Sequence, residues 1–174
     1  MIDHQALIDA HCRQHSLTLT LSTDMPAGYE TAYGTYAPET RMLHINTALL
    51  QGAPRADALF YLYHELRHAE QYQHPERFSE IIRHSLPYVL LYNGKCFKQT
   101  AAGWASCQLE GDEAWFTRAY LSLPYELDAN EYACRQLECE GLEATHLRSF
   151  WIPAQPLPEA EFIRLFRQID EGIH

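Results

Sequence analysis

Lysine is nearly missing from this sequence: Lys95 and Lys98 are the two lysines among thirteen basic residues, and the formal net charge is −10. Acidic residues are most concentrated between Glu110 and Glu143, a stretch with few arginines. This charge would repel a phosphate backbone, and no stripe of basic residues offsets it. The composition therefore argues against nucleic acid as a partner and favours a neutral or cationic peptide.

Long apolar runs and paired cysteines are also missing. No run approaches the length that spans a bilayer, and the first residues, MIDHQALIDAHCRQH, lack the basic start, apolar stretch and cleavage site of a signal peptide. We therefore expect a soluble, cytoplasmic protein without a membrane partner, with export by a route that ignores such signals left open. The five cysteines form no CxxC pair, which argues against a zinc ribbon and indicates reduced, mostly buried thiols. A cysteine nucleophile is the weaker alternative, because no motif surrounds any of them.

The spacing of apolar residues predicts a mixture of helices and short strands. Helices are expected at 2–15, 53–73, 78–92 with a break before Pro87, 100–107, 113–121, 124–140 and 159–168. Strands are expected at 17–22, 29–36 and 41–46. Hydrophobic residues make up 47% of the 174 residues, and no linker or repeat interrupts them. We therefore expect an α+β fold in a single domain covering residues 1–174.

The stretch YHELRHAEQY, residues 63–72, places two histidines four positions apart with a glutamate directly after the first. On a helix, His64 and His68 lie one turn apart on one face and can direct both imidazoles at a single ion. Glu65 is turned by about 100° from His64, where a base can take a proton from a water that the ion activates. The alternative is a polar helix surface, but apolar neighbours surround the motif. The spacing therefore predicts a Zn²⁺ site with Glu65 as the catalytic base.

A catalytic zinc ion needs a third protein ligand and one open position. Gln71 stands where the longer pattern HExxHxxGxxH has glycine, so that pattern is not satisfied and His74 is not expected to serve. In LPYELDANEYACRQLE, residues 123–138, Glu126 shares an otherwise apolar helical face with two alanines and a leucine. A carboxylate on such a face is costly unless a partner compensates its charge, so Glu126 is the expected third ligand. The alternatives are another ligand, Glu131 or His84, and a simple ion pair of Glu126 with Arg67 or Arg118.

With HExxH on one helix and a glutamate on a later one, the chain resembles the gluzincin branch of zinc peptidases. HELRHAEQ and PYELDANEYA are also similar to the HExRHAxQ and PxExxA patterns of small bacterial zincin-like proteins. The resemblance covers about residues 29–138 and implies a minimal zincin-like fold, with a small sheet packed beside an HExxH helix. It implies Zn²⁺, with His64, His68 and Glu126 as ligands and Glu65 as base. Larger gluzincins also have a His or Tyr that stabilises the transition state, for which the candidates here are Tyr33, His84, Tyr125 and Tyr132.

These features predict a zinc-dependent peptidase that acts on a peptide or protein substrate. The strand expected at 41–46 is the candidate for pairing with an extended peptide along its edge. Asp57, Glu70 and Glu131 are the candidates for orienting the ligand histidines. Two alternatives remain open: a catalytically inactive zincin-fold binding or regulatory module, and a zinc amidase or peptidase effector that acts on cell-wall peptides.

Overall fold

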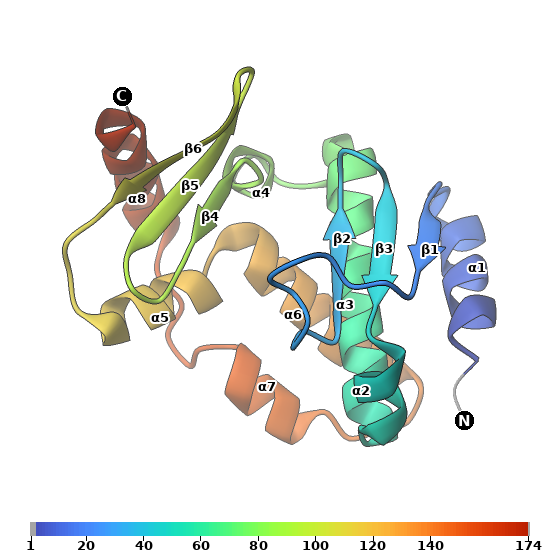
Figure 1. The fold of residues 1–174 in the computed structure, drawn as a ribbon. Helices are drawn as coiled ribbons and strands as arrows, with labels where there is room; N and C mark the ends of the chain where they lie inside the picture. The colour runs from blue at the N-terminus through green and yellow to red at the C-terminus, as the bar shows by residue number, and fades with distance from the viewer. Residues whose placement is uncertain (1–2, 174) are drawn as a thin grey trace. The chain divides into compact units, whose positions relative to one another are not determined.

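Two compact units make up the chain, whose computed structural model describes residues 3–173. The first unit consists of Met1–Arg77 and Ala129–Arg148, and the second of Phe78–Asp128 and Ser149–His174. Each contains helices and one three-stranded sheet, so the expected α+β class is confirmed (Figure 1). The helix α6 (Pro124–Cys139) contributes residues to both units without a break. That the chain is a single domain stays a prediction.

The sheet of the first unit has the strand order β1-β3-β2. Its strands are β1 (Thr20–Ser22), β2 (Gly34–Ala37) and β3 (Met42–Ile45). β3 pairs in parallel with β1 and antiparallel with β2, so it is the middle strand. β3 is the strand expected at 41–46, and because both of its sides are occupied, the expectation that a peptide pairs along its edge is wrong. The neighbouring β2 is an edge strand of this sheet.

A long helix, α3 (Arg55–Gln73), lies beside this sheet and packs against β2 (Figure 1). Its apolar residues recur at helical spacing, and Leu59, Leu62 and Leu66 are at most 2% exposed. Tyr36 of β2 joins Ala69 of α3 in one buried cluster. The first unit also contains α1 (His4–His15), α2 (Thr47–Gly52) and the short 3₁₀ helix η1 (Pro75–Arg77). The packing of α3 against an edge strand is what positions the HExxH residues.

The second unit is built on an antiparallel sheet with the order β4-β5-β6. Its strands are β4 (Tyr88–Leu90), β5 (Lys95–Thr100) and β6 (Gly103–Gln108). Its helices are α4 (Glu80–Ser85), α5 (Glu113–Leu121) and α8 (Glu159–Gly172), while α7 (Thr145–Trp151) has residues in both units. α8 packs against β5 and β6, and its Asp170 carboxylate accepts hydrogen bonds from Tyr88 and Lys98.

This second sheet was not expected from the sequence. The helix expected at 78–92 is the short α4 followed by β4, because Pro87 cannot continue a helix and the next residues pair with β5. The helix expected at 100–107 is wrong as well. Those residues end β5, turn through Ala101 and Ala102, and form β6, with Gly103 in the left-handed conformation at φ 110°. Pairing across the hairpin here outweighs the helix preference of the alanines.

Most other elements lie where the sequence places them. The helices expected at 113–121, 124–140 and 159–168 correspond to α5, α6 and α8, whereas α2 and α7 were missed. The strands expected at 17–22 and 29–36 are shorter, beginning at Thr20 and Gly34. Among residues 3–173, none of the helices combines the length and the apolar character required to cross a membrane.

Candidate metal centre

Two histidines meet on one face of α3. His64 Nε2 and His68 Nε2 are 2.9 Å apart, and their rings are nearly perpendicular at 88°. Two nitrogens bound to one tetrahedral zinc ion would be about 3.3 Å apart, given Zn–N bonds of about 2.0–2.1 Å. A change of a few tenths of an ångström would therefore bring both lone pairs onto one ion. The helical spacing alone accounts for this arrangement, because positions four apart share a face.

The carboxylate of Glu126, in the first turn of α6, completes a group of three. One ligand atom each from His64, His68 and Glu126 can be chosen such that all three lie within 4.8 Å of one another. On the helical face that carries Glu126, Ala129 and Ala133 are 0% exposed, and Asn130, one turn after Glu126, is 2% exposed. Two imidazole nitrogens and one carboxylate oxygen form a ligand set that suits zinc and leave a fourth position open. The group fits such an ion, and its identity as a zinc site stays a prediction.

The alternative third ligands have other partners. Glu131 forms an ion pair with Arg135 at 3.6 Å on the solvated side of α6. His84 packs against Tyr88 and Phe166 in the second unit. Within residues 3–173, neither belongs to a group of three side chains with ligand atoms close enough to hold an ion.

Glu65 lies against the edge strand β2. Its Oε2 accepts a hydrogen bond of 2.8 Å from the backbone N–H of Tyr36. Gly34, two residues earlier on β2, lies close to this side chain: a Cβ there would lie 3.4 Å from Glu65 Cγ and, more tightly, 3.1 Å from the carbonyl oxygen of His44. One carboxylate oxygen is therefore held by the strand, and Glu65 is not a member of the group formed by His64, His68 and Glu126.

The residues expected to orient the ligand histidines do something else. Asp57 pairs with His146 at 3.0 Å, and Glu131 pairs with Arg135. The expected role is wrong for both. The contact to His68 comes instead from Gln71, whose Oε1 lies 2.8 Å from His68 Nδ1. This residue was not expected from the sequence, although its i, i+3 spacing from His68 could have identified it.

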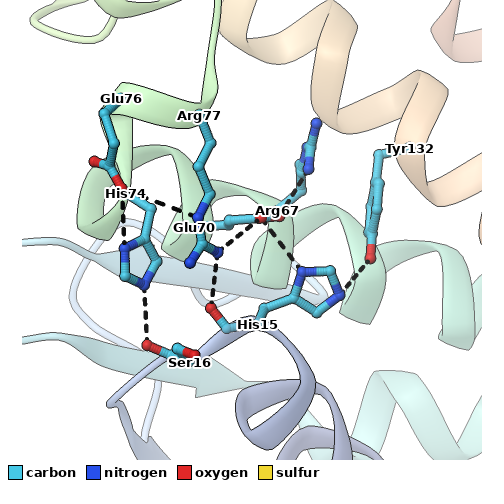
Figure 2. A network of polar contacts seen from close by, with 8 residues as sticks. All are labelled: His15, Ser16, Arg67, Glu70, His74, Glu76, Arg77 and Tyr132. Atoms are coloured by element: carbon cyan, nitrogen blue, oxygen red, sulfur yellow. Dashed lines mark hydrogen bonds and ion pairs between the residues drawn. The ribbon is translucent and has the colours of Figure 1, made fainter.

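Glu70, the third of these candidates, is the centre of a separate buried network (Figure 2). Its carboxylate contacts Arg67 at 2.7 Å, His15 of α1 at 3.3 Å and Arg77 at 3.5 Å. Burial by itself would raise the pKa of Glu70, but the charge and hydrogen bond of Arg67, with help from His15, outweigh burial and hold that pKa below its ordinary value. Glu70 therefore connects α1 to α3 and does not orient a ligand.

Besides His84, the candidates for transition-state stabilisation are three tyrosines, whose contacts differ. Tyr125 donates a hydrogen bond to the Tyr88 carbonyl, and Tyr132 lies in the Glu70 network beside His15. Tyr33 precedes Gly34 of β2 and stacks on Tyr61 of α3, with ring centroids 4.1 Å apart and planes 6° apart. Because Tyr61 is one turn before Glu65 on α3, Tyr33 packs against the helix that carries Glu65.

Comparison of this chain with family models, with curated proteins and with solved structures gives no match.

Proposed function

We propose that this protein is a zinc-dependent peptidase with a zincin-like active site, in which His64, His68 and Glu126 hold the ion and Glu65 is the general base. The observation that carries the proposal is the convergence of two histidines and one glutamate, with ligand atoms within 4.8 Å, beside a second glutamate held by an edge strand. A zinc ion bound there supplies Lewis acidity and an activated water.

The contacts of Glu65 suit the role of a base. Its Oε2 is held by the Tyr36 amide, which leaves Oε1 to take a proton. General bases of this kind must be positioned within hydrogen-bond reach of the proton that they remove. After the attack, the same carboxyl group can return the proton to the departing amine.

The edge strand β2 offers a place for a peptide. In an antiparallel pair, alternate residues direct their N–H and C=O groups away from the neighbouring strand. Asn46 N donates to Tyr33 O, so Gly34 and Tyr36 direct their groups to the opposite side, the free edge. The Tyr36 amide already reaches Glu65, which leaves the N–H and C=O of Gly34 to pair with an extended substrate next to the base.

The experiment uses the purified chain with one equivalent of zinc and a mixture of fluorogenic peptides. Glu65→Gln should retain zinc and lower hydrolysis by about 10²–10⁴-fold, because it removes general base catalysis. Glu131→Gln, a glutamate paired with an arginine on the solvated side of α6, is the matched control and should retain activity.

Full hydrolysis by Glu65→Gln would remove this residue from the mechanism. Zinc uptake by the unmodified chain without hydrolysis of any peptide would instead support the binding module over the enzyme. Preference for short cell-wall stem peptides over unstructured polypeptides would identify the amidase alternative.

A further inference from the structure

Gln71 closes the stretch HELRHAEQ and lies three residues after His68 on α3. It is 0% exposed, and its Oε1 lies 2.8 Å from His68 Nδ1. A fully buried amide is costly unless its polar atoms are hydrogen-bonded, so the partners of this side chain matter. One partner is His68, an expected metal ligand, and this contact indicates the role of Gln71.

We propose that Gln71 is a positioning residue that holds His68 in the tautomer required to bind a metal ion, an inference that rests on the proposed zinc centre. The amide oxygen can only accept a hydrogen bond, so the proton of His68 must be on Nδ1. A neutral imidazole has one N–H, and Nε2 therefore keeps its lone pair. That lone pair lies on the side of His64, whose own Nε2 is 2.9 Å away.

The opposite orientation of the amide would give a different site. If the NH₂ group of Gln71 donated to Nδ1, the proton of His68 would be on Nε2. His68 would then donate a hydrogen bond to His64 and would have no lone pair for an ion. The orientation of one buried amide thus decides whether Nε2 of His68 carries a lone pair or a proton, and it also fixes the ring plane of His68.

The first test reads the tautomer in the metal-free protein. Long-range ¹H–¹⁵N spectra recorded in the presence of a chelator should show the proton of His68 on Nδ1, with the signal assigned by comparison with His68→Asn. In Gln71→Met, which keeps the length of the side chain without the acceptor, this preference should be lost. A proton on Nε2 in the unmodified chain would overturn the proposal.

The second test measures zinc affinity by competition with a chelating dye. Gln71→Met should bind zinc about 10–100-fold more weakly, the usual effect of removing a partner of a ligand histidine. Gln71→Glu keeps an acceptor and should retain affinity. The control is Gln73→Met, on the same helix, which loses hydrogen bonds to Thr18 and Tyr36 and should lower stability without changing zinc affinity.

The outcomes separate this proposal from the peptidase proposal. Zinc binding that falls in Gln71→Met and is restored in Gln71→Glu supports the positioning role, whether or not the protein hydrolyses peptides. Equal affinity of Gln71→Met and the unmodified chain overturns the role and leaves the peptidase in place. Absence of zinc binding by the unmodified chain overturns both.

Discussion

Replacing His11 with phenylalanine should remove a large part of the acid sensitivity of this protein. His11 lies on α1, is 6% exposed, and stacks on His15 at 4.2 Å. Within residues 3–173, its Nε2 is buried without a hydrogen-bond partner. Burial first, and then the neighbouring His15 and Arg67, lower the pKa of His11 from 6.5 to about 4, with Glu70 acting in the opposite direction.

The sign of the effect follows from proton binding. Between pH 6.5 and about 4 the unfolded chain protonates His11 and the folded chain does not, so folding stability is lost as the pH falls through this range. The difference between the two pKa values corresponds to about 3 kcal/mol in total, most of it lost by about pH 4.5. Glu70, with its pKa below the ordinary 4.5, loses its own contribution only at lower pH. Above pH 4.5 the comparison of the two proteins therefore isolates His11, because His4, whose pKa burial also lowers, is present in both.

The assay is urea unfolding followed by tryptophan fluorescence at several pH values between 7.5 and 4.5, with a chelator present so that metal release does not contribute. The free energy of unfolding of the unmodified chain should fall by about 2–3 kcal/mol more over this range than that of His11→Phe. Comparison at pH 7.5 gives the packing cost of the substitution by itself. Equal losses in the two proteins would refute the claim that His11 is held neutral by burial.

Three further predictions concern single residues of the centre and its framework. Glu126→Ala should weaken zinc binding by about 10²-fold or more, because each ligand of a four-ligand zinc site contributes roughly 3 kcal/mol to the binding free energy. Full zinc occupancy of this variant in a metal analysis would mean that another acid is the ligand. Gly34→Ala should lower peptide hydrolysis and stability, because its Cβ would lie 3.1 Å from the backbone of β3 and 3.4 Å from the proposed base. The control is Gly52→Ala, whose Cβ would have nothing within 4 Å and which should be neutral or stabilising in thermal unfolding. Asp112→Ala should cost about 1 kcal/mol in urea unfolding, since its side chain accepts the hydrogen bond that begins α5, and an unchanged midpoint would argue against this cap.

The spacing of residues along the sequence predicted the structure well wherever the relevant residues all lie on one helix. The spacing of Leu59, Leu62 and Leu66 predicts α3 and its buried face, and the four-residue spacing of His64 and His68 predicts that their rings meet. The second sheet could not be predicted from periodicity within one segment. Its strands include alanines and lysines that carry no strong strand preference, so the pairing of β5 with β6 is decided by residues on the opposite strand.

Polar residues were also predictable where the signal lies within one helix, and unpredictable where it depends on a distant segment. Glu126 could be chosen from the sequence as the candidate third ligand, because a lone carboxylate among apolar residues on a helical face is unusual in any fold. The role of Glu70 was not recognisable, because its partner His15 lies on α1, far away in the sequence. Gln71 could have been identified from its i, i+3 spacing to His68 within α3. Glu70 faces α1 and meets His15, whereas Gln71 contacts His68.

The sequence by itself determined the chemistry available on each helix, since i, i+4 spacing and an apolar face are properties of a single segment. The tertiary structure alone decided that β2 is the edge strand that holds Glu65 and that Glu70 pairs with His15 of α1. Such choices depend on which segments pack together, and the free energy of packing is shared among residues far apart in the chain.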